Sequence, residues 1–231
     1  SQIIEQNNFI LEKYKSGNNC SKLYIATQHY DFVADIFGKL LNEIKEECYR
    51  FFLREMKTYD VIYETETAYC DIGIIAIKDK ERSIMERYIN QRGLTFAPLI
   101  NAMPHVYVRK EHPIANYTVI TNGLLYKYPY VSYEQGEHNS TFFTEEITYI
   151  SSDKHVEISD RATLMNILLA TDSYTVGTGI MPSLLNEGRI VSIPYESEDF
   201  YTIGYILRAD RNLSELTKRF IELLKKSVKN I

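Results

Sequence analysis

Hydrophobic residues in the first hundred positions alternate between short continuous runs and stripes at helical spacing. The continuous runs at 22–27 and 70–77 are typical of parallel strands buried on both faces, and 49–55 also reads as a strand. Between these strands the spacing predicts an amphipathic helix at 31–47 and a second helix at 58–69. This alternation predicts a parallel sheet with helices on both faces.

The rest of the chain continues the alternation with shorter strands. Helices are predicted at 160–171, with Asp160 as N-cap, and at 213–228. A short helix is also expected between Pro182 and Gly188. Strands are predicted at 94–100, 105–109, 128–134, 155–159, 174–180, 189–194 and 200–208. The last strand and helix are expected to return to the first half, which predicts two lobes with two crossings and a ligand cleft between them.

Composition and charge narrow the class of protein. The chain has 231 residues, of which 45% are hydrophobic and 25% charged, as in ordinary globular proteins. Its net charge of −5 makes it a poor candidate for holding nucleic acid through its own surface. The basic cluster within 218–229 lies near the end of the last predicted helix, where cations offset the helix dipole.

The cysteines and the apolar runs predict a location. Cys20, Cys48 and Cys70 are odd in number and widely spaced, which favours a reduced intracellular compartment. We find neither an apolar run of membrane length nor a signal peptide in the sequence. We therefore expect a cytoplasmic protein with no membrane partner.

The sequence gives little support for catalysis. Its five histidines are scattered and form no metal-binding spacing. It has no nucleophile elbow, no P-loop and no Gly-x-Gly-x-x-Gly, and the Ser-x-x-Lys at 151–154 stands without partner motifs. We expect no metal, no cofactor and no enzymatic activity.

The order of several short segments carries a resemblance to a known family. These segments are KLYIAT (22–27), CDIGIIAI (70–77), RKEHPIA (109–115), TVGTGIMPSLL (175–185), GRIVSIP (188–194) and LTKRFIELLKK (216–226). In this order and spacing, the chain resembles the effector-binding domain of LysR-type transcriptional regulators.

The resemblance implies a two-lobed α/β fold like that of type 2 periplasmic binding proteins. Each lobe would be a mostly parallel sheet flanked by helices, and two crossover strands would join the lobes. The implied division is 1–18 for the tail of a linker helix, 19–100 plus 204–231 for lobe I, and 101–203 for lobe II. A small-molecule effector would bind between the lobes. DNA would be contacted only through a helix-turn-helix domain that is absent from this sequence.

The resemblance also implies a homodimer or tetramer. In this family, subunits pair side by side and antiparallel, through the first helix and second strand of one subunit and a second-lobe helix of the other. These segments correspond here to 31–47, 49–55 and 160–171.

Candidate effector-binding residues follow the strand ends. Thr27, Gln28 and His29 come directly after the first strand, where unpaired backbone N–H groups can hold an anion. The alternative is that Thr27 or Gln28 simply caps the helix. Lys57 and Thr58 follow the second strand, and Lys57 could equally be a solvated side chain.

The remaining candidates come from the middle and second half of the chain. They are Ile100, Gln135, Asn139, Ser140 and Thr178. The segment 134–141 could be an ordinary turn, and Thr178 lies in a glycine turn that we interpret as mainly structural. The candidates are mostly neutral hydrogen-bonding groups with one lysine, which predicts a small anion or carboxylate; the tyrosine content leaves an aromatic ligand open.

Two alternatives share the same fold. One is a solute-binding protein of a transporter, which would need an export signal. The other is an enzyme such as a prephenate dehydratase or a deaminase, which would turn over its cleft ligand.

Overall fold

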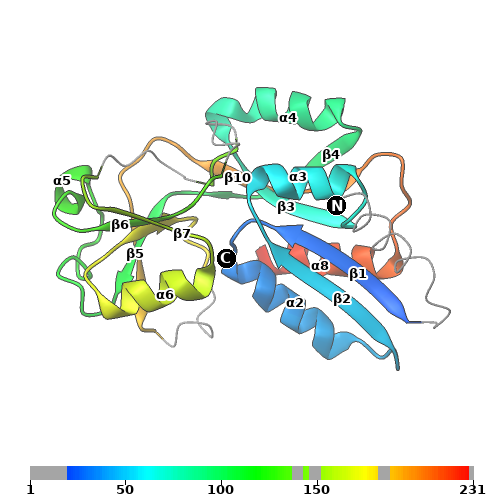
Figure 1. Cartoon of the computed structure of the whole chain (residues 1–231), viewed down its shortest axis with the longest axis horizontal. Coiled ribbons are helices and arrows are strands. Elements are labelled where there is room, and N and C mark those ends of the chain that lie inside the picture. The colour runs from blue at the N-terminus through cyan, green and yellow to red at the C-terminus, as the bar shows by residue number, and fades with distance from the viewer. Residues whose placement is uncertain (1–19, 137–142, 146–151, 182–187, 229–231) are drawn as a thin grey trace.

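The structure is a computed structural model that describes residues 20–136, 143–145, 152–181 and 188–228. Figure 1 shows two lobes side by side, one built around β1, β2, β3, β4 and β10 and the other around β5 to β9. The expected two-lobed α/β architecture is therefore confirmed. The linker helix expected within 1–18 and the helix expected from Pro182 lie outside the described residues.

The first lobe holds a five-stranded sheet with the order β2-β1-β3-β10-β4. Its strands are β1 (Ser21–Thr27), β2 (Tyr49–Glu55), β3 (Ile72–Lys78), β10 (Tyr201–Arg208) and β4 (Leu94–Ala102). β1 runs parallel to β2 and β3, as predicted, while β10 is antiparallel to both β3 and β4. β10 therefore returns to the first lobe from the second lobe, as its position near the end of the chain predicts.

Helices cover both faces of this sheet. α2 (Asp31–Glu43) and α8 (Glu215–Val228) pack on one face, and α3 (Thr58–Glu66) and α4 (Arg82–Gln91) on the other (Figure 1). Leu23 and Ile25 of β1 belong to the first core, and the alternating Tyr24 and Ala26 to the second. This explains why the strand reads as a continuous apolar run.

The helix α4 was absent from the elements that the sequence predicted. It follows the 3-10 turn η1 (Asp79–Glu81), and among its residues Met85 and Ile89 are buried. Two buried positions four residues apart suffice to seat one face of a helix on a sheet, but they give a weak periodic signal.

In the residues that the structure describes, the second lobe contains two smaller sheets and two helices. β8 (Thr175–Gly177), β5 (His105–Arg109) and β9 (Ile190–Pro194) form an antiparallel sheet, and β6 (Tyr130–Tyr133) pairs parallel with β7 (His155–Ile158). α6 (Arg161–Ala170) and the short α5 (Asn122–Leu125) flank them. The expectation of a mostly parallel sheet thus holds for β6 and β7 but is wrong for the three-stranded sheet. β5 is antiparallel to both of its neighbours because β8 and β9 return along it from distant parts of the chain.

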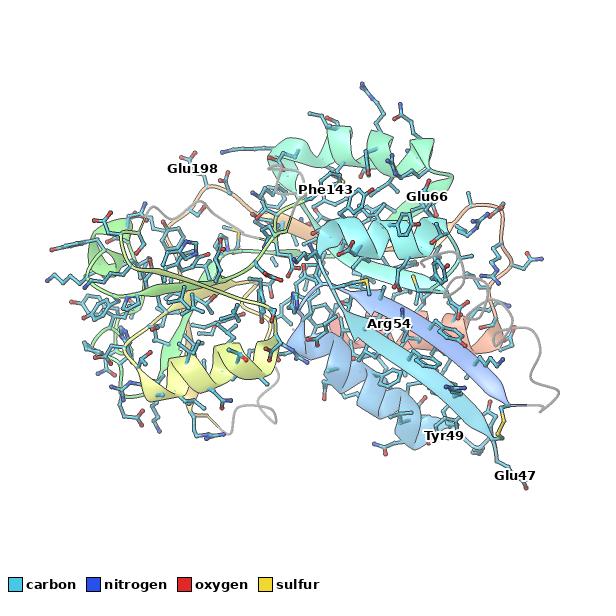
Figure 2. The ribbon with its side chains drawn as sticks, in the orientation of Figure 1. Glu47, Tyr49, Arg54, Glu66, Phe143 and Glu198 are labelled. Carbon is cyan, nitrogen blue, oxygen red and sulfur yellow. A yellow bond between two sulfur atoms is a disulfide. The ribbon has the colours of Figure 1, made fainter. Side chains whose placement is uncertain are left out.

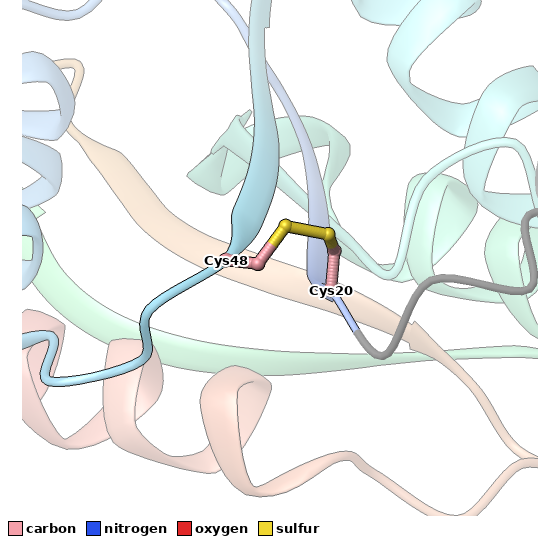
Figure 3. The surroundings of a disulfide bond; sticks show 2 residues. All are labelled: Cys20 and Cys48. Carbon is pink, nitrogen blue, oxygen red and sulfur yellow. A yellow bond between two sulfur atoms is a disulfide. The ribbon is translucent and has the colours of Figure 1, made fainter.

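A disulfide joins Cys20 to Cys48 (Figure 3), whereas the sequence favoured three reduced cysteines. The two residues are 28 positions apart, but they immediately precede β1 and β2, whose first residues Ser21 and Tyr49 are register partners. Parallel pairing therefore brings the cysteines together, with 4.6 Å between their Cα atoms. Figure 2 shows the bond at the outer end of the sheet, close to Glu47 and Tyr49.

Within the described ranges, no helix is long and apolar enough to cross a membrane.

Candidate functional site

A pocket lies where the two lobes meet, and both lobes line it. The first lobe contributes residues that directly follow β1, together with Ala76 of β3. The second contributes α6, β8 and single residues of β5, β6 and the 143–145 segment. The lining residues are His29, Tyr30, Asp31, Ala76, Tyr107, Tyr133, Glu145, Arg161, Leu164, Met165, Leu168, Thr175, Val176, Gly177, Thr178, Ile180 and Met181.

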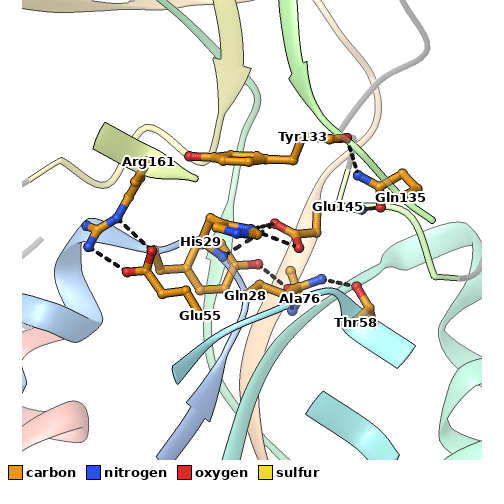
Figure 4. Close-up of polar contacts among 10 residues, drawn as sticks. Gln28, His29, Glu55, Thr58, Ala76, Tyr133, Gln135, Glu145 and Arg161 are labelled. Atoms are coloured by element: carbon orange, nitrogen blue, oxygen red, sulfur yellow. Dashed lines mark hydrogen bonds and ion pairs between the residues drawn. The ribbon is translucent and has the colours of Figure 1, made fainter. Parts of the chain in front are cut away.

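Of the polar side chains that follow β1, Gln28 has a structural role and His29 lines the pocket. Gln28 is 1% exposed, and its side-chain oxygen accepts hydrogen bonds from the backbone N–H of Ala76 (2.7 Å) and the Tyr30 hydroxyl (2.5 Å). Its amide donates to the Thr58 hydroxyl. Gln28 and Thr58 therefore fasten β1 to β3 and α3 beneath the pocket, as Figure 4 shows.

Thr27 lies deeper than its place in the sequence suggested. It is fully buried, and its hydroxyl has no hydrogen-bond partner in the part of the chain that the structure describes. The N-cap of α2 is Tyr30, so the alternative in which Thr27 or Gln28 caps this helix is wrong.

His29 reaches across the junction to the second lobe. Its Nδ1 lies 2.9 Å and 3.1 Å from the two carboxylate oxygens of Glu145, and its ring stacks on Tyr133 with 4.0 Å between centroids (Figure 4). Burial acts to lower the pKa of His29, but the hydrogen bond and charge of Glu145 outweigh it and raise the pKa above 6.5. His29 and Glu145 thus form a well-buried ion pair between the lobes.

A second ionic contact between the lobes centres on Arg161, the first residue of α6. Its guanidinium pairs with Asp31, the first residue of α2, and with Glu55 at the end of β2. The Arg161 Nη2 lies 2.5 Å and its Nε 3.1 Å from the two Glu55 oxygens. Asp160 fixes the start of α6 by accepting a hydrogen bond from the backbone N–H of Thr163 (2.9 Å), as predicted, and this positions Arg161.

A third ion pair and two hydrogen bonds involve Lys57, Glu134 and Gln135. We call these residues the rim, because they do not line the pocket but follow the lining residue Tyr133 in sequence or pair with such a residue. Lys57 lies 3.0 Å from Glu134, with Lys57 side-chain exposure of 28%. Gln135 accepts a hydrogen bond from the backbone N–H of Glu145 (3.1 Å) and donates to the carbonyl of Tyr133 (2.7 Å). Gln135 therefore holds Glu145 in place from behind.

Phe143 anchors the segment that carries Glu145. Its ring makes edge contacts with Tyr59 of α3 (5.5 Å) and Tyr88 of α4 (5.1 Å). Figure 2 shows Phe143 beside these helices of the first lobe. Phe143 thus docks the described residues 143–145 on the first lobe.

The wall opposite His29 is formed by the turn after β8. A Cβ at Gly177 would lie 2.4 Å from the Tyr107 ring, so glycine allows this ring to lie against β8. Gly179 adopts a φ of +77°, and a Cβ there would meet the His105 ring at 2.5 Å. Both glycines therefore shape the wall, and Thr178 between them is buried and lines the pocket.

The predicted site residues thus fall into separate groups. His29 and Thr178 line the pocket, Thr27, Gln28 and Thr58 lie beneath it, and Lys57 and Gln135 lie at its rim. Ile100 packs against the first core and is not among the lining residues. Asn139 and Ser140 lie outside the described residues.

Several pocket residues escaped the sequence analysis. Asp31, Glu145 and Arg161 supply most of its charge, and Tyr30, Tyr107 and Tyr133 its aromatic rings. Asp31 and Arg161 could have been found because each opens a helix after a strand, where the family resemblance places the cleft. Glu145 has no comparable signal in the sequence.

The pocket offers hydrogen bonding, charge and apolar surface. Among the residues that the structure describes, no group of three or more His, Cys, Asp or Glu side chains is arranged to hold a metal ion. The arrangement is suited to binding a small molecule between the two lobes.

Comparison with known proteins gives a family match. The model of the LysR substrate binding domain matches residues 53–229, well over half of the chain. A search of curated proteins returns no match.

Solved structures share the fold at low sequence identity. Full-length OxyR C199D from Pseudomonas aeruginosa is 18% identical with a TM-score of 0.59, and the match covers 98% of this chain and 76% of that one. The CcmR regulatory domain of Synechocystis PCC6803 in complex with 2-PG is 14% identical with a TM-score of 0.61, covering 91% and 99%. The effector binding domain of QuiR in complex with shikimate is 14% identical with a TM-score of 0.58, covering 92% and 99%.

Proposed function

Because the chain belongs to the LysR substrate binding domain family, we propose that it senses a small-molecule effector in the pocket between its lobes. The observation that carries this proposal is that residues of both lobes line one pocket. A molecule bound there contacts both lobes and favours the arrangement in which its contacts are best. The effector then acts by shifting the population of lobe arrangements.

Two similar structures support a ligand in this fold. The QuiR domain is described in complex with shikimate and the CcmR domain in complex with 2-PG. For this chain we propose the same class of function, a regulator and not an enzyme, with an effector of its own.

The proposal extends to assembly and location. We infer a homodimer or tetramer in the cytoplasm, in which DNA is contacted by a separate helix-turn-helix domain. The net charge of −5 supports this division, since an acidic surface repels the phosphate backbone. Effector binding in the cleft would alter how the subunits of such an assembly sit on DNA.

Thermal melting against small metabolites tests the cleft. The panel contains amino acids, organic acids, aromatic acids, amines and inorganic anions. A ligand at a hundred times its dissociation constant adds about 2.7 kcal/mol to the free energy of unfolding, which raises the melting temperature measurably.

Two matched variants show where a ligand binds. Met165→Trp places an indole in the pocket, whereas Ile84→Trp adds the same side chain at an exposed position of α4. We expect Met165→Trp to abolish the rise in melting temperature and Ile84→Trp to leave it intact. A ligand that stabilises both variants equally would place its site elsewhere and contradict the proposal.

A further inference from the structure

Among the described residues, the charged groups at the pocket do not balance. Asp31 and Glu145 line it, and Glu55 is paired to the lining Arg161, so three carboxylates face one guanidinium and one imidazole. Their charges sum to −1 when His29 is protonated (−3 + 2) and to −2 when it is neutral (−3 + 1). The Lys57–Glu134 pair at the rim adds nothing to this sum, because its charges cancel.

Arg161 supplies the only guanidinium among the described lining residues, and it is already paired. Arg161 is held on two sides, by Asp31 and by both oxygens of Glu55. An anionic ligand would have to compete with Asp31 and Glu55 for Arg161, and it would also approach Glu145 at short range. Charge repulsion in a partly dehydrated pocket makes that approach unfavourable.

The carboxylates also affect the pKa of tyrosine hydroxyls that line the pocket. Burial raises the pKa of Tyr133, and the charges of Glu145, Asp31 and Glu55 raise it further, with Arg161 opposing them. Burial is also the largest cause of the raised pKa of Tyr107, to which Asp31 adds while hydrogen bonds with Thr178 and Gly179 oppose it. The carboxylates are therefore close enough to both tyrosines to affect the pKa of their hydroxyls.

Aromatic rings and apolar side chains line the rest of the pocket. Tyr30, Tyr107 and Tyr133 place three electron-rich rings in the lining, and such rings attract cations to their faces; one face of Tyr133 is already stacked on His29. The remaining wall is apolar and comes from α6, β8 and the segment after β8. It consists of Leu164, Met165, Leu168, Val176, Ile180 and Met181.

From the pocket's charge, rings and apolar wall we infer that its effector carries a cationic head group, a protonated amine or quaternary ammonium, on an apolar body. This inference rests on the proposed function, since it names the ligand class for the same cleft. The head group lies among the carboxylates and tyrosine rings, and the body packs on the α6 wall. The sequence predicted a small anion or carboxylate from neutral hydrogen-bonding candidates, which did not include Asp31, Glu55 and Glu145. The negative charge of these three residues disfavours such a ligand.

Ligands with the same phenylethyl body and head groups of opposite charge test the inference. 2-Phenylethylamine and 3-phenylpropionate share a phenyl body, and benzyltrimethylammonium adds a quaternary head group. Calorimetry and thermal melting of the full chain at pH 7 measure their binding. We expect both cations to bind at least tenfold more tightly than the carboxylate.

Charge-neutral variants locate the interaction. Asp31→Asn removes a lining carboxylate while its partner Arg161 stays charged, and Asp210→Asn removes a carboxylate paired with Arg208 outside the pocket lining. We expect Asp31→Asn to weaken cation binding about tenfold, and Asp210→Asn to change it less than twofold. Met165→Trp blocks the pocket and should abolish binding.

The outcomes separate the two proposals. A carboxylate that binds more tightly than its matched amine and is lost in Met165→Trp would overturn the charge inference, while the cleft proposal would stand. The charge inference is also overturned if the wild type binds no amine or quaternary ammonium at millimolar concentration, or if Met165→Trp binds it equally well. The cleft proposal fails as well if no metabolite of the panel binds the wild type and loses that binding in Met165→Trp.

Discussion

His29 illustrates how a single residue couples the two lobes. It leaves the end of β1, stacks on Tyr133 of β6 and pairs with Glu145, and its side chain is only 6% exposed. A charged imidazole strengthens this contact and a neutral one weakens it. The protonation state of one side chain therefore influences how firmly the lobes hold together.

This arrangement predicts a pH dependence of stability. Because the pKa of His29 is raised in the folded protein, the pair stabilises the fold fully below the unfolded value of 6.5. That contribution is lost as the pH rises through the raised folded pKa. At pH 6, Glu145→Gln should lower the free energy of unfolding by about 1.5–3 kcal/mol, measured by urea denaturation.

The same comparison at pH 8.5 provides the control. There the wild type and Glu145→Gln should differ less, because His29 loses its proton as the pH rises through its raised pKa. An equal difference at the two pH values would show that the His29–Glu145 pair does not contribute through the histidine charge.

At the scale of elements, hydrophobic pattern located most strands and helices, but it could not reveal their neighbours. The apolar runs of β1 and β3 predicted strands buried on both faces, and the structure confirms this because two cores share the sheet. α4 escaped prediction because only Met85 and Ile89 of its residues are buried. The register of β1 with β2 is what joins Cys20 to Cys48, and spacing along the chain does not encode that register.

The disulfide is expected to stabilise the edge of the first lobe. It closes a loop with a sequence separation of 28 that contains α2, and chain entropy assigns such a crosslink about 3–4 kcal/mol. Cys48→Ser should lower the free energy of unfolding by roughly that amount under oxidising conditions, measured by guanidinium denaturation.

A thiol reductant separates the crosslink from side-chain effects. With reductant present, the wild type should lose the same stability and approach Cys48→Ser. If the free energy of unfolding of the wild type exceeds that of Cys48→Ser by the same amount with and without reductant, the disulfide does not contribute to stability.

At the scale of the whole molecule, the first lobe leaves apolar side chains exposed on α2 and β2. Leu41 is 36% and Tyr49 48% exposed, and half-buried Phe37 and Phe51 contact each other beside them, 6.4 Å between centroids. β2 is also an edge strand, which presents unpaired backbone groups. These features support the proposed subunit interface, which the family resemblance places on the same segments.

The interface gives a prediction about mass in solution. Sedimentation at micromolar concentration should show a dimer for the wild type and for Ile84→Glu, whose site lies on α4 at the opposite face of the sheet. Leu41→Glu should shift the protein to monomer, because a charge buried at the interface is unpaired. A monomeric wild type, or a dimeric Leu41→Glu, would contradict this interface.

By itself, the sequence determined the two-lobed α/β class, the position of most strands and helices, and the family. Two of its candidate residues, His29 and Thr178, line the pocket, because loops after strands gather at one edge of a sheet; their binding of an effector stays a prediction. These features depend on local periodicity and on the order of segments, both of which can be read along the chain.

Only the tertiary structure decided which side chains meet across the cleft. Asp31 and Arg161 are 130 positions apart, and His29 and Glu145 are 116 apart. Their contacts depend on how one lobe closes on the other, to which no local pattern corresponds. Gln28 is turned inward by hydrogen bonds to Ala76 and Thr58 within the first lobe, which also lie far from it in the sequence. The charge of the pocket likewise is a sum over residues that only folding brings together.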